Sequence, residues 1–352
     1  MTRAALLYGP LDIRIKDLPD EEPGPGELLL DVTAVGICGS DLHSYLNGGI
    51  GGTVATSPLV LGHEAAGRVA RLGAGLAGKF TIGQLVAIDP AIHCGECEQC
   101  LNGRQHLCTR MQFIGLFPRH GALRTQMIHP AEQCITLPAG MNPITAALLE
   151  PLGVALHASR LARIAVDEDV LVLGCGAIGL ILIQLARLAG AKRIFAADRY
   201  EWRLDLARRY GADFTVNAGK GDIVELVQDT TAMRGVDVAI ESAWVADTAD
   251  QCLEAARPGG RVVIVGIPAE DVMTMRASTA RRKELSIDMS RRMNHVYSTS
   301  IDLVTRGKIS LEALATHCFT LDQSAQALDT AANYRDGVVR AVVLPNPSHE
   351  LN

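Results

Sequence analysis

A stretch in the middle of this 352-residue chain constrains its fold more than any other part. The apolar run Val170–Leu173 leads into Gly174, and the apolar run Gly179–Ala189 has the length and composition of a buried helix. A further short run, Arg193–Ala197, ends at Asp198. Strand, glycine turn, helix and strand in this order predict a β-α-β unit, whose two strands are parallel and joined by the helix.

The same alternation continues beyond residue 198. Apolar patterns predict three more helices and two more strands: Arg203–Tyr210, Ile223–Asp229 and Thr248–Ala256 as helices, Val236–Ile240 and Arg261–Val265 as strands. Strands that alternate with helices indicate a doubly wound parallel sheet of the Rossmann type. A late helix, Ser298–Arg306, and a closing strand, Val338–Val343, are expected to return to the first part of the chain.

Residues 1 to about 150 have a different character. Short apolar runs are separated by Pro/Gly segments, and the runs are Ala4–Tyr8, Leu28–Val35, Ala65–Leu72 and Leu85–Ile88. This pattern predicts a compact, mainly antiparallel β unit. Apolar spacing between Ala146 and Leu161 predicts a helix interrupted at Pro151. We therefore expect an α/β protein with a β-rich domain (residues 1–153 and 291–352) and a doubly wound domain (residues 154–290).

Charge and hydropathy exclude several classes of protein. A net charge of −6 leaves no Lys/Arg surplus to displace counterions from a nucleic acid. The N-terminus carries Arg3, Asp12 and Arg14 and lacks the apolar core of a signal peptide. The uncharged stretch Val170–Ala186 contains three glycines and is at the short edge of a membrane span. We expect a cytoplasmic protein without nucleic-acid or membrane partners.

The glycine turn also predicts a ligand. Gly174, Gly176 and Gly179 form G-x-G-x-x-G, in which the glycines permit a tight turn, a close backbone approach to pyrophosphate and close helix packing. Asp198 ends the second strand, where a carboxylate accepts hydrogen bonds from ribose hydroxyls. The acid favours NAD over NADP, although Arg199 beside it could hold a 2′-phosphate. The alternative is a glycine turn that binds nothing, with Asp198 as a helix cap.

Two sets of metal-ligand residues stand out before residue 151. Four cysteines in a lobe of about residues 93–110 can supply a closed tetrahedral zinc site, namely Cys94, Cys97, Cys100 and Cys108. Reduced thiols or an iron–sulfur cluster are the alternatives. A second set combines one thiolate, one imidazole and two carboxylates: Cys38, His63, Glu64 and Glu150. Such a set suits a catalytic zinc with an open position, although each of these residues alone is more often structural.

These motifs, in this order, resemble the zinc-dependent medium-chain dehydrogenases/reductases, and in particular their polyol branch of sorbitol, xylitol and L-idonate dehydrogenases. The resemblance covers essentially the whole chain and rests on three motifs besides the four cysteines: Cys38-Gly-Ser-Asp-Leu-His43, Gly62-His63-Glu64-Ala-Ala-Gly67 and Gly174-x-Gly176-x-x-Gly179. It implies a GroES-like β domain beside the Rossmann domain, two zinc ions per subunit, and a homo-oligomer, either a dimer or a tetramer.

The resemblance also implies roles for single residues. Cys38, His63 and Glu64 match the catalytic zinc ligands, and Glu150 matches an acid that reaches the metal directly or through water. Ser40 and His43 match a relay that carries the alcohol proton to solvent, which needs an imidazole near the surface. Asp41 is expected to support the fold. The expected dinucleotide contacts are Gly174, Gly176, Ile178, Gly179, Asp198, Arg199, Arg203, Gly266, Ile267 and Arg340. The expected substrate contacts are Ser44, Tyr45, Phe113, Ile114 and Arg292.

One departure affects the substrate. Polyol members often show Phe-Arg-Tyr where this chain has Arg291-Arg292-Met293, so the aromatic residue is lost. Paired arginines suit a carboxylate as well as a polyol, and an interdomain salt bridge is the alternative for Arg292. We expect NAD-dependent oxidation of a secondary hydroxyl of a small polyol or sugar acid to a ketone. The alternatives are an L-threonine or simple secondary-alcohol dehydrogenase and, more distantly, a non-enzymatic NAD-responsive binding protein.

Overall fold

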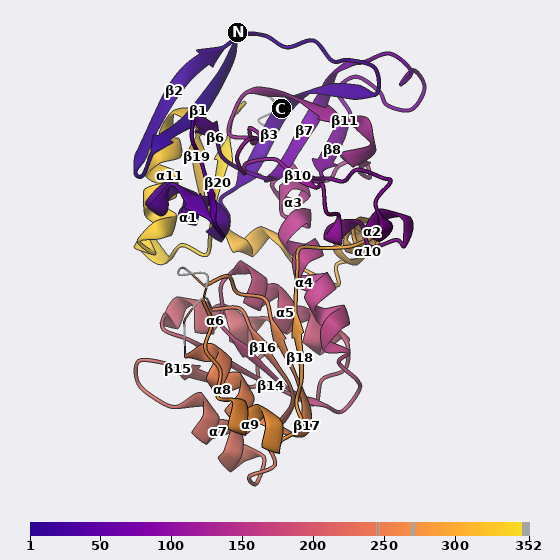
Figure 1. Cartoon of the computed structure of the whole chain (residues 1–352). Helices are drawn as coiled ribbons and strands as arrows, with labels where there is room; N and C mark the ends of the chain where they lie inside the picture. Colours follow the sequence, from indigo (N-terminus) through magenta and orange to yellow (C-terminus); the bar gives the residue numbers. More distant parts are fainter. Residues whose placement is uncertain (244, 246, 269–271, 347–352) are drawn as a thin grey trace. The chain divides into compact units, whose positions relative to one another are not determined.

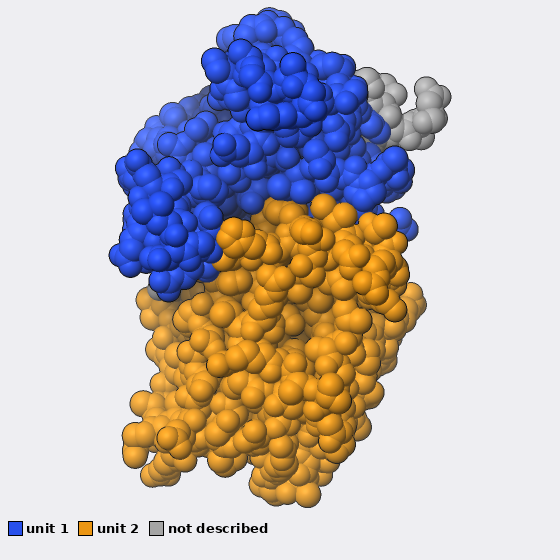
Figure 2. All heavy atoms as spheres, turned by 90° about the vertical axis from the view of Figure 1, so that its right-hand side faces the viewer, with its two compact units in different colours: residues 1–150, 311–352 blue, residues 151–310 orange. Residues whose placement is uncertain are grey.

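The computed structural model describes residues 1–243, 245, 247–268 and 272–346. The chain divides into two compact units, which Figure 2 colours separately. Unit 1 comprises Met1–Glu150 and Leu311–Asn352, and unit 2 comprises Pro151–Ser310. Each unit has its own sheet, and each is described by itself.

Unit 2 is built on a six-stranded parallel sheet in the order β15-β14-β13-β16-β17-β18. Its strands are β13 (Asp169–Leu173), β14 (Arg193–Asp198), β15 (Phe214–Asn217), β16 (Val236–Glu241), β17 (Ala256–Ile264) and β18 (Ser286–Met289). The strand order reverses between β13 and β16. In open parallel sheets, ligands bind beyond the carboxyl ends of the strands at such a reversal.

Both faces of this sheet are covered, which explains why its central strands are continuously apolar. All five residues of β13 are buried, whichever face they point to. The helices of unit 2 are α4 (Leu149–Ala162, which begins at the end of unit 1), α5 (Ala177–Leu188), α6 (Glu201–Arg209), α7 (Ile223–Thr230), α8 (Thr248–Ala255), α9 (Ala277–Arg282) and α10 (Tyr297–Thr305) (Figure 1). The predicted doubly wound architecture is confirmed.

Unit 1 is built on a mostly antiparallel, seven-stranded sheet. The order is β12-β8-β7-β3-β20-β19, and β11 also pairs with β3. Its strands are β3 (Glu27–Gly36), β7 (Glu64–Leu72), β8 (Leu85–Ile88), β11 (Gln126–Pro130), β12 (Cys134–Thr136), β19 (Ala315–Thr320) and β20 (Arg340–Leu344). The late strand β20 pairs with the end of β3, so both ends of the sequence contribute to one sheet.

Smaller elements complete unit 1. A three-stranded sheet in the order β2-β1-β6 contains β1 (Thr2–Gly9), β2 (Asp12–Leu18) and β6 (Leu59–Val60). Two short ladders pair β4 (Gly49–Ile50) with β5 (Thr53–Val54) and β9 (Ala91–Ile92) with β10 (Gln112–Phe113). The helices are α1 (Gly39–Asn47), α2 (Glu98–Leu101), α3 (Pro143–Ala147) and α11 (Ser324–Ala332). The predicted β-rich first domain is confirmed.

Two expectations from the sequence are corrected by the structure. Pro151 does not interrupt a helix, because it lies in the first turn of α4, where a proline removes no intrahelical hydrogen bond. Residues 291–310 belong to unit 2 rather than to the β-rich unit. Their segment is tied to α4, since the Arg160 guanidinium donates to the carbonyl oxygens of Asn294 and His295, and Met293 packs against Gly153.

Among the described residues, no helix combines the length and the apolar character that crossing a bilayer requires.

Candidate metal and dinucleotide sites

Three potential metal ligands from two separate loops meet in unit 1. Cys38 lies two residues beyond the end of β3 and is the N-cap of α1, while His63 precedes β7 and Glu64 is the first residue of β7. The antiparallel register pairs Gly36 with Glu64, so the end of β3 lies beside the start of β7. As a result, one ligand atom from each of Cys38, His63 and Glu64 lies within 4.8 Å of the other two. A thiolate, an imidazole and a carboxylate at this spacing fit a zinc ion.

A fourth residue, Asp41, holds the two loops together. Its carboxylate accepts hydrogen bonds from the backbone N–H groups of Cys38 and Gly62, both at 2.9 Å. The same carboxylate lies 3.5 Å from Nδ1 of His63, which leaves Nε2 available as a ligand. Asp41 is 1% exposed. From its sequence context, Asp41 was expected only to support the fold. In the structure it contacts two of the three candidate ligands, Cys38 and His63.

The charges around these ligands favour a bound cation. Burial alone would lower the pKa of His63, but the negative charges of Asp41 and Cys38 raise it well above its usual value. Burial raises the pKa of Glu150 to about 8, with Glu64 adding to the rise and His63 opposing it. Glu150 is therefore electrostatically coupled to the site. Among the described residues, it is not one of the three whose ligand atoms converge within 4.8 Å.

Arg340 lies beside the same cluster. Its guanidinium is 3.3 Å from Glu64 and donates a hydrogen bond of 2.6 Å to the carbonyl oxygen of Ile37. The side chain is buried on β20. The expected contact between Arg340 and a pyrophosphate stays a prediction. In the structure the guanidinium interacts with Glu64 and with the carbonyl oxygen of Ile37, both in unit 1.

Two polar residues of α1 are candidates for moving a proton. Ser40 Oγ lies 3.4 Å from His63 Nε2. His43 is only 4% exposed, so the expected imidazole near the surface is corrected to a buried one. Ser44 and Tyr45, two expected substrate contacts, are also buried on this helix.

The remaining expected substrate contacts lie in both units. The Phe113 ring is 5.2 Å from the His63 ring, which places Phe113 next to the metal ligands, and Ile114 beside it is buried. Arg292 belongs to unit 2, where its backbone is left-handed with φ 54°. Next to it, Met293 occupies the notch at Gly153, where an added Cβ would lie 2.4 Å from its sulfur.

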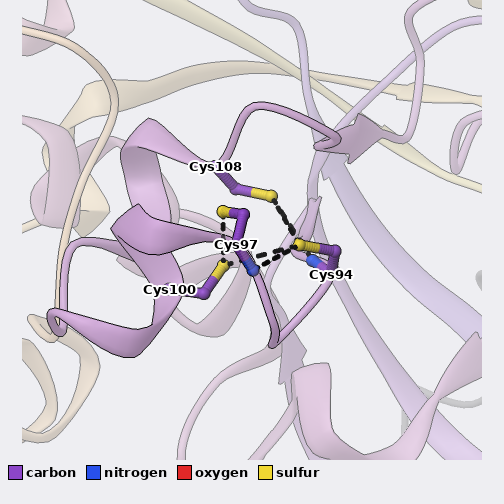
Figure 3. Close-up of side chains that lie close together, drawn as sticks. All are labelled: Cys94, Cys97, Cys100 and Cys108. Atoms are coloured by element: carbon purple, nitrogen blue, oxygen red, sulfur yellow. Dashed lines mark hydrogen bonds between the residues drawn. The ribbon is translucent and has the colours of Figure 1, made fainter.

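The four cysteines of the lobe converge on one point, as Figure 3 shows. The distances between sulfur atoms are 3.5 Å for Cys97–Cys100 and Cys94–Cys108, and 3.9 Å for Cys94–Cys100. Backbone N–H groups of Cys100 and Thr109 lower the pKa of the Cys97 thiol to about 5. The Arg110 guanidinium also lies 3.4 Å from Cys94 Sγ. Thiolate character at this spacing fits a closed tetrahedral zinc site.

The glycine turn of unit 2 has the shape that a bound pyrophosphate requires. Gly174 has φ 91°, and a Cβ on Gly179 would lie 1.8 Å from the Gly174 oxygen. In contrast, no atom of the described residues beyond the two chain neighbours lies within 4 Å of the position a Cβ on Gly176 would take, so this backbone can approach a ligand. Helix α5 begins at Ala177, and its first N–H groups can donate to an anion.

Asp198 fixes the edge of this turn. Its carboxylate accepts from the N–H groups of Cys175 at 2.8 Å and Tyr200 at 3.0 Å, and it lies 3.6 Å from the Arg203 guanidinium. Arg199 is exposed beside it. The other expected dinucleotide contacts, Ile178, Gly266 and Ile267, are partly or fully exposed.

Two family models match successive parts of the chain. Residues 24–139 match the alcohol dehydrogenase GroES-like domain, and residues 177–306 match the zinc-binding dehydrogenase domain. The chain is 32% identical to sorbitol dehydrogenase of Bacillus subtilis (98% of this chain, 97% of the relative) and 34% identical to L-idonate 5-dehydrogenase of Vitis vinifera (94% and 91%). A solved structure from Sinorhizobium meliloti 1021, described as a zinc-binding dehydrogenase bound to NADP, has a TM-score of 0.90 at 33% identity (98% and 99%).

We expect Asp41→Asn to weaken metal binding in the three-ligand cluster by about 10–100-fold, as removal of a hydrogen bond to a metal ligand usually does. The NH₂ group of the asparagine side chain would face one of the backbone N–H groups, of Cys38 or Gly62, that now donate to the carboxylate of Asp41. Chelator competition measures the affinity. Asp31→Asn is the control, because Asp31 lies on β3 and accepts from Gln126. Equal metal affinity in the two variants would contradict the role of Asp41.

We expect Cys97→Ser to remove one zinc ion per chain and to lower the thermal midpoint by several degrees, since a closed metal site contributes its binding energy to folding. Metal analysis and a thermal melt check this. Cys318→Ser, at an exposed position on β19, should change neither quantity. A loss of turnover in Cys97→Ser with full metal content and an unchanged melt would argue against a structural zinc.

Proposed function

This chain belongs to the zinc-dependent alcohol and polyol dehydrogenases that join a GroES-like domain to a zinc-binding dehydrogenase domain, and we propose that it oxidises a secondary hydroxyl of a small polyol or sugar acid to a ketone with NAD. The observation that carries the proposal is the convergence of Cys38, His63 and Glu64 within 4.8 Å. Because the end of β3 pairs with the start of β7, the fold itself brings the three ligands together.

In the proposed site, Cys38, His63 and Glu64 would hold a zinc ion that lowers the pKa of the substrate hydroxyl, and the nicotinamide would accept the hydride. The substrate carbon gives up a hydride and the hydroxyl gives up a proton, so that alcohol and NAD become ketone, NADH and a proton. Both Glu64 and Glu150 remain candidate ligands, since both carboxylates are buried in unit 1.

The protein's own residues would handle the proton. Ser40 Oγ lies 3.4 Å from Nε2 of the candidate ligand His63. It can accept a proton from the substrate hydroxyl while it donates its own proton to the next group in the relay. His43 lies one turn further along α1 and is the next proton carrier in the proposal. Because His43 is buried, it would hold the proton within unit 1 rather than release it directly to water.

Two observations support the choice of substrate class. Relatives named sorbitol dehydrogenase and L-idonate 5-dehydrogenase match almost the full length of the chain. Arg291 and Arg292 add positive charge that would suit a sugar acid. L-Threonine and simple secondary alcohols are the alternative substrates. We further propose a cytoplasmic homo-oligomer, a dimer or a tetramer, as the resemblance to polyol dehydrogenases implies.

The proposed preference for NAD rests on Asp198. Its carboxylate is held in place by two backbone N–H groups, so negative charge stays where a 2′-phosphate would lie. Arg199 and Arg203 are the groups that could favour NADP instead.

We expect Cys38→Ser to abolish turnover while NADH binding is retained, because the thiolate belongs to the metal site and not to the glycine turn. Reduction of NAD should be followed with xylitol, sorbitol, L-idonate, galactitol, L-threonine and 2-butanol, and nicotinamide fluorescence reports binding. Cys318→Ser is the matched control. Full activity in Cys38→Ser would refute the site, and activity on threonine alone would refute the polyol assignment.

We expect Asp198→Ala to lower kcat/KM for NAD by about tenfold or more relative to NADP, which corresponds to the loss of one charged hydrogen-bonding group. Arg199→Ala should act in the opposite direction by weakening any use of NADP. Steady-state kinetics with both dinucleotides check this. An unchanged ratio in Asp198→Ala would mean that the carboxylate does not read the ribose.

A further inference from the structure

A buried carboxylate lies at the reversal of strand order in unit 2, and neither the metal site nor the glycine motif accounts for it. Glu241 is the last residue of β16 and is 1% exposed. Its Oε1 accepts from the Ala243 N–H and lies 2.8 Å from the Thr248 hydroxyl, while Oε2 accepts from the Gly266 N–H at 3.1 Å. All three donors are neutral. The carboxylate therefore connects two loops that follow neighbouring strands.

The same residue is joined to the glycine turn through the next two residues of the chain. The Ser242 hydroxyl lies 2.9 Å from the Leu173 oxygen and 3.0 Å from the Gly174 oxygen. A Cβ on Gly174 would lie 2.7 Å from the Cα of Ala243. Ser242 and Ala243 thus join the glycine turn to the end of β16, and the Glu241 carboxylate joins Ala243 to Gly266 after β17.

The opposite end of β16 carries a buried acid of a different kind. Asp237 is 4% exposed and pairs with two guanidinium groups, those of Arg234 at 2.7 Å and Arg257 at 2.6 Å. Burial would raise the pKa of Asp237, but the two arginines lower it below its usual range. This acid stabilises the edge away from the proposed ligand. By contrast, the carboxylate oxygens of Glu241 accept hydrogen bonds from the backbone N–H groups of Ala243 and Gly266, at the edge of the sheet where a ligand would bind.

We propose that Glu241 is a positioning residue for the dinucleotide. It holds the backbone N–H groups of Ala243 and Gly266 in place for the nicotinamide half of the dinucleotide. This inference rests on the proposed function, in which the dinucleotide binds at this edge. A glutamine has one carbonyl oxygen and one NH₂ group. At this position it would therefore turn a donor toward Gly266 or toward Ala243 and Thr248.

The test compares Glu241→Gln with Asp237→Asn in the full-length, zinc-loaded protein. Both variants replace a buried acid of β16 by its amide, but only Asp237→Asn also leaves two guanidinium groups without their acid. The dissociation constant for NADH is measured by nicotinamide fluorescence, together with zinc content and the thermal midpoint. We expect Glu241→Gln to raise the dissociation constant about tenfold, the effect of one mismatched buried group. Asp237→Asn should lower the midpoint and leave NADH binding within about twofold, within the error of matched variants.

NADH binding by the wild-type protein tests the proposed function, and the comparison of the two variants tests the role of Glu241. Wild-type protein that binds no NADH would overturn the proposed function. Wild-type binding with equal dissociation constants in the two variants would overturn only the role of Glu241. If Glu241→Gln does not fold, Thr248→Val removes one donor and leaves the carboxylate in place. A dissociation constant above that of wild type, at unchanged zinc content, then supports the inference, and an unchanged constant overturns it.

Discussion

The candidate metal site depends on one buried carboxylate and the three groups it meets. Asp41 accepts from the N–H groups of Cys38 and Gly62 and lies against Nδ1 of His63. Strand pairing brings the two loops near each other, but pairing alone does not set the direction of their side chains. The carboxylate does so, because its two oxygens fix both loop backbones and select the tautomer of the imidazole.

The buried acidic side chains described above differ in their hydrogen-bond and ion-pair partners. Asp237 faces two guanidinium groups and contributes to the stability of the sheet edge. Asp41 and Glu241 instead accept from backbone N–H groups of loops, where a carboxylate orders the chain without introducing a second long side chain. Asp41 also lies 3.5 Å from Nδ1 of His63, one of the candidate metal ligands, whereas the hydrogen-bond donors around Glu241 are all neutral. Both carboxylates therefore fix backbone groups where a metal ion or a dinucleotide is proposed to bind.

Much of this organisation is readable from local sequence patterns, and the rest is not. The glycine turn and the four cysteines lie within short segments, so their spacing alone predicts their geometry. Long-range pairing is different: β18 and β19 are edge strands with few buried residues, and no periodic pattern marks them. The role of Asp41 depends on the loop before His63, which lies 21 residues away from it.

Gly36 shows how tightly the site limits variation. It pairs with Glu64 across the two strands, and even a methyl group there would lie 2.3 Å from the carboxylate oxygen. Any other residue would push Glu64 away from both Arg340 and the thiolate of Cys38. Position 36 therefore accepts only a glycine as long as Glu64 keeps its present place. Descendants of this chain that acquire new substrates should keep a glycine at that position for as long as they keep the metal.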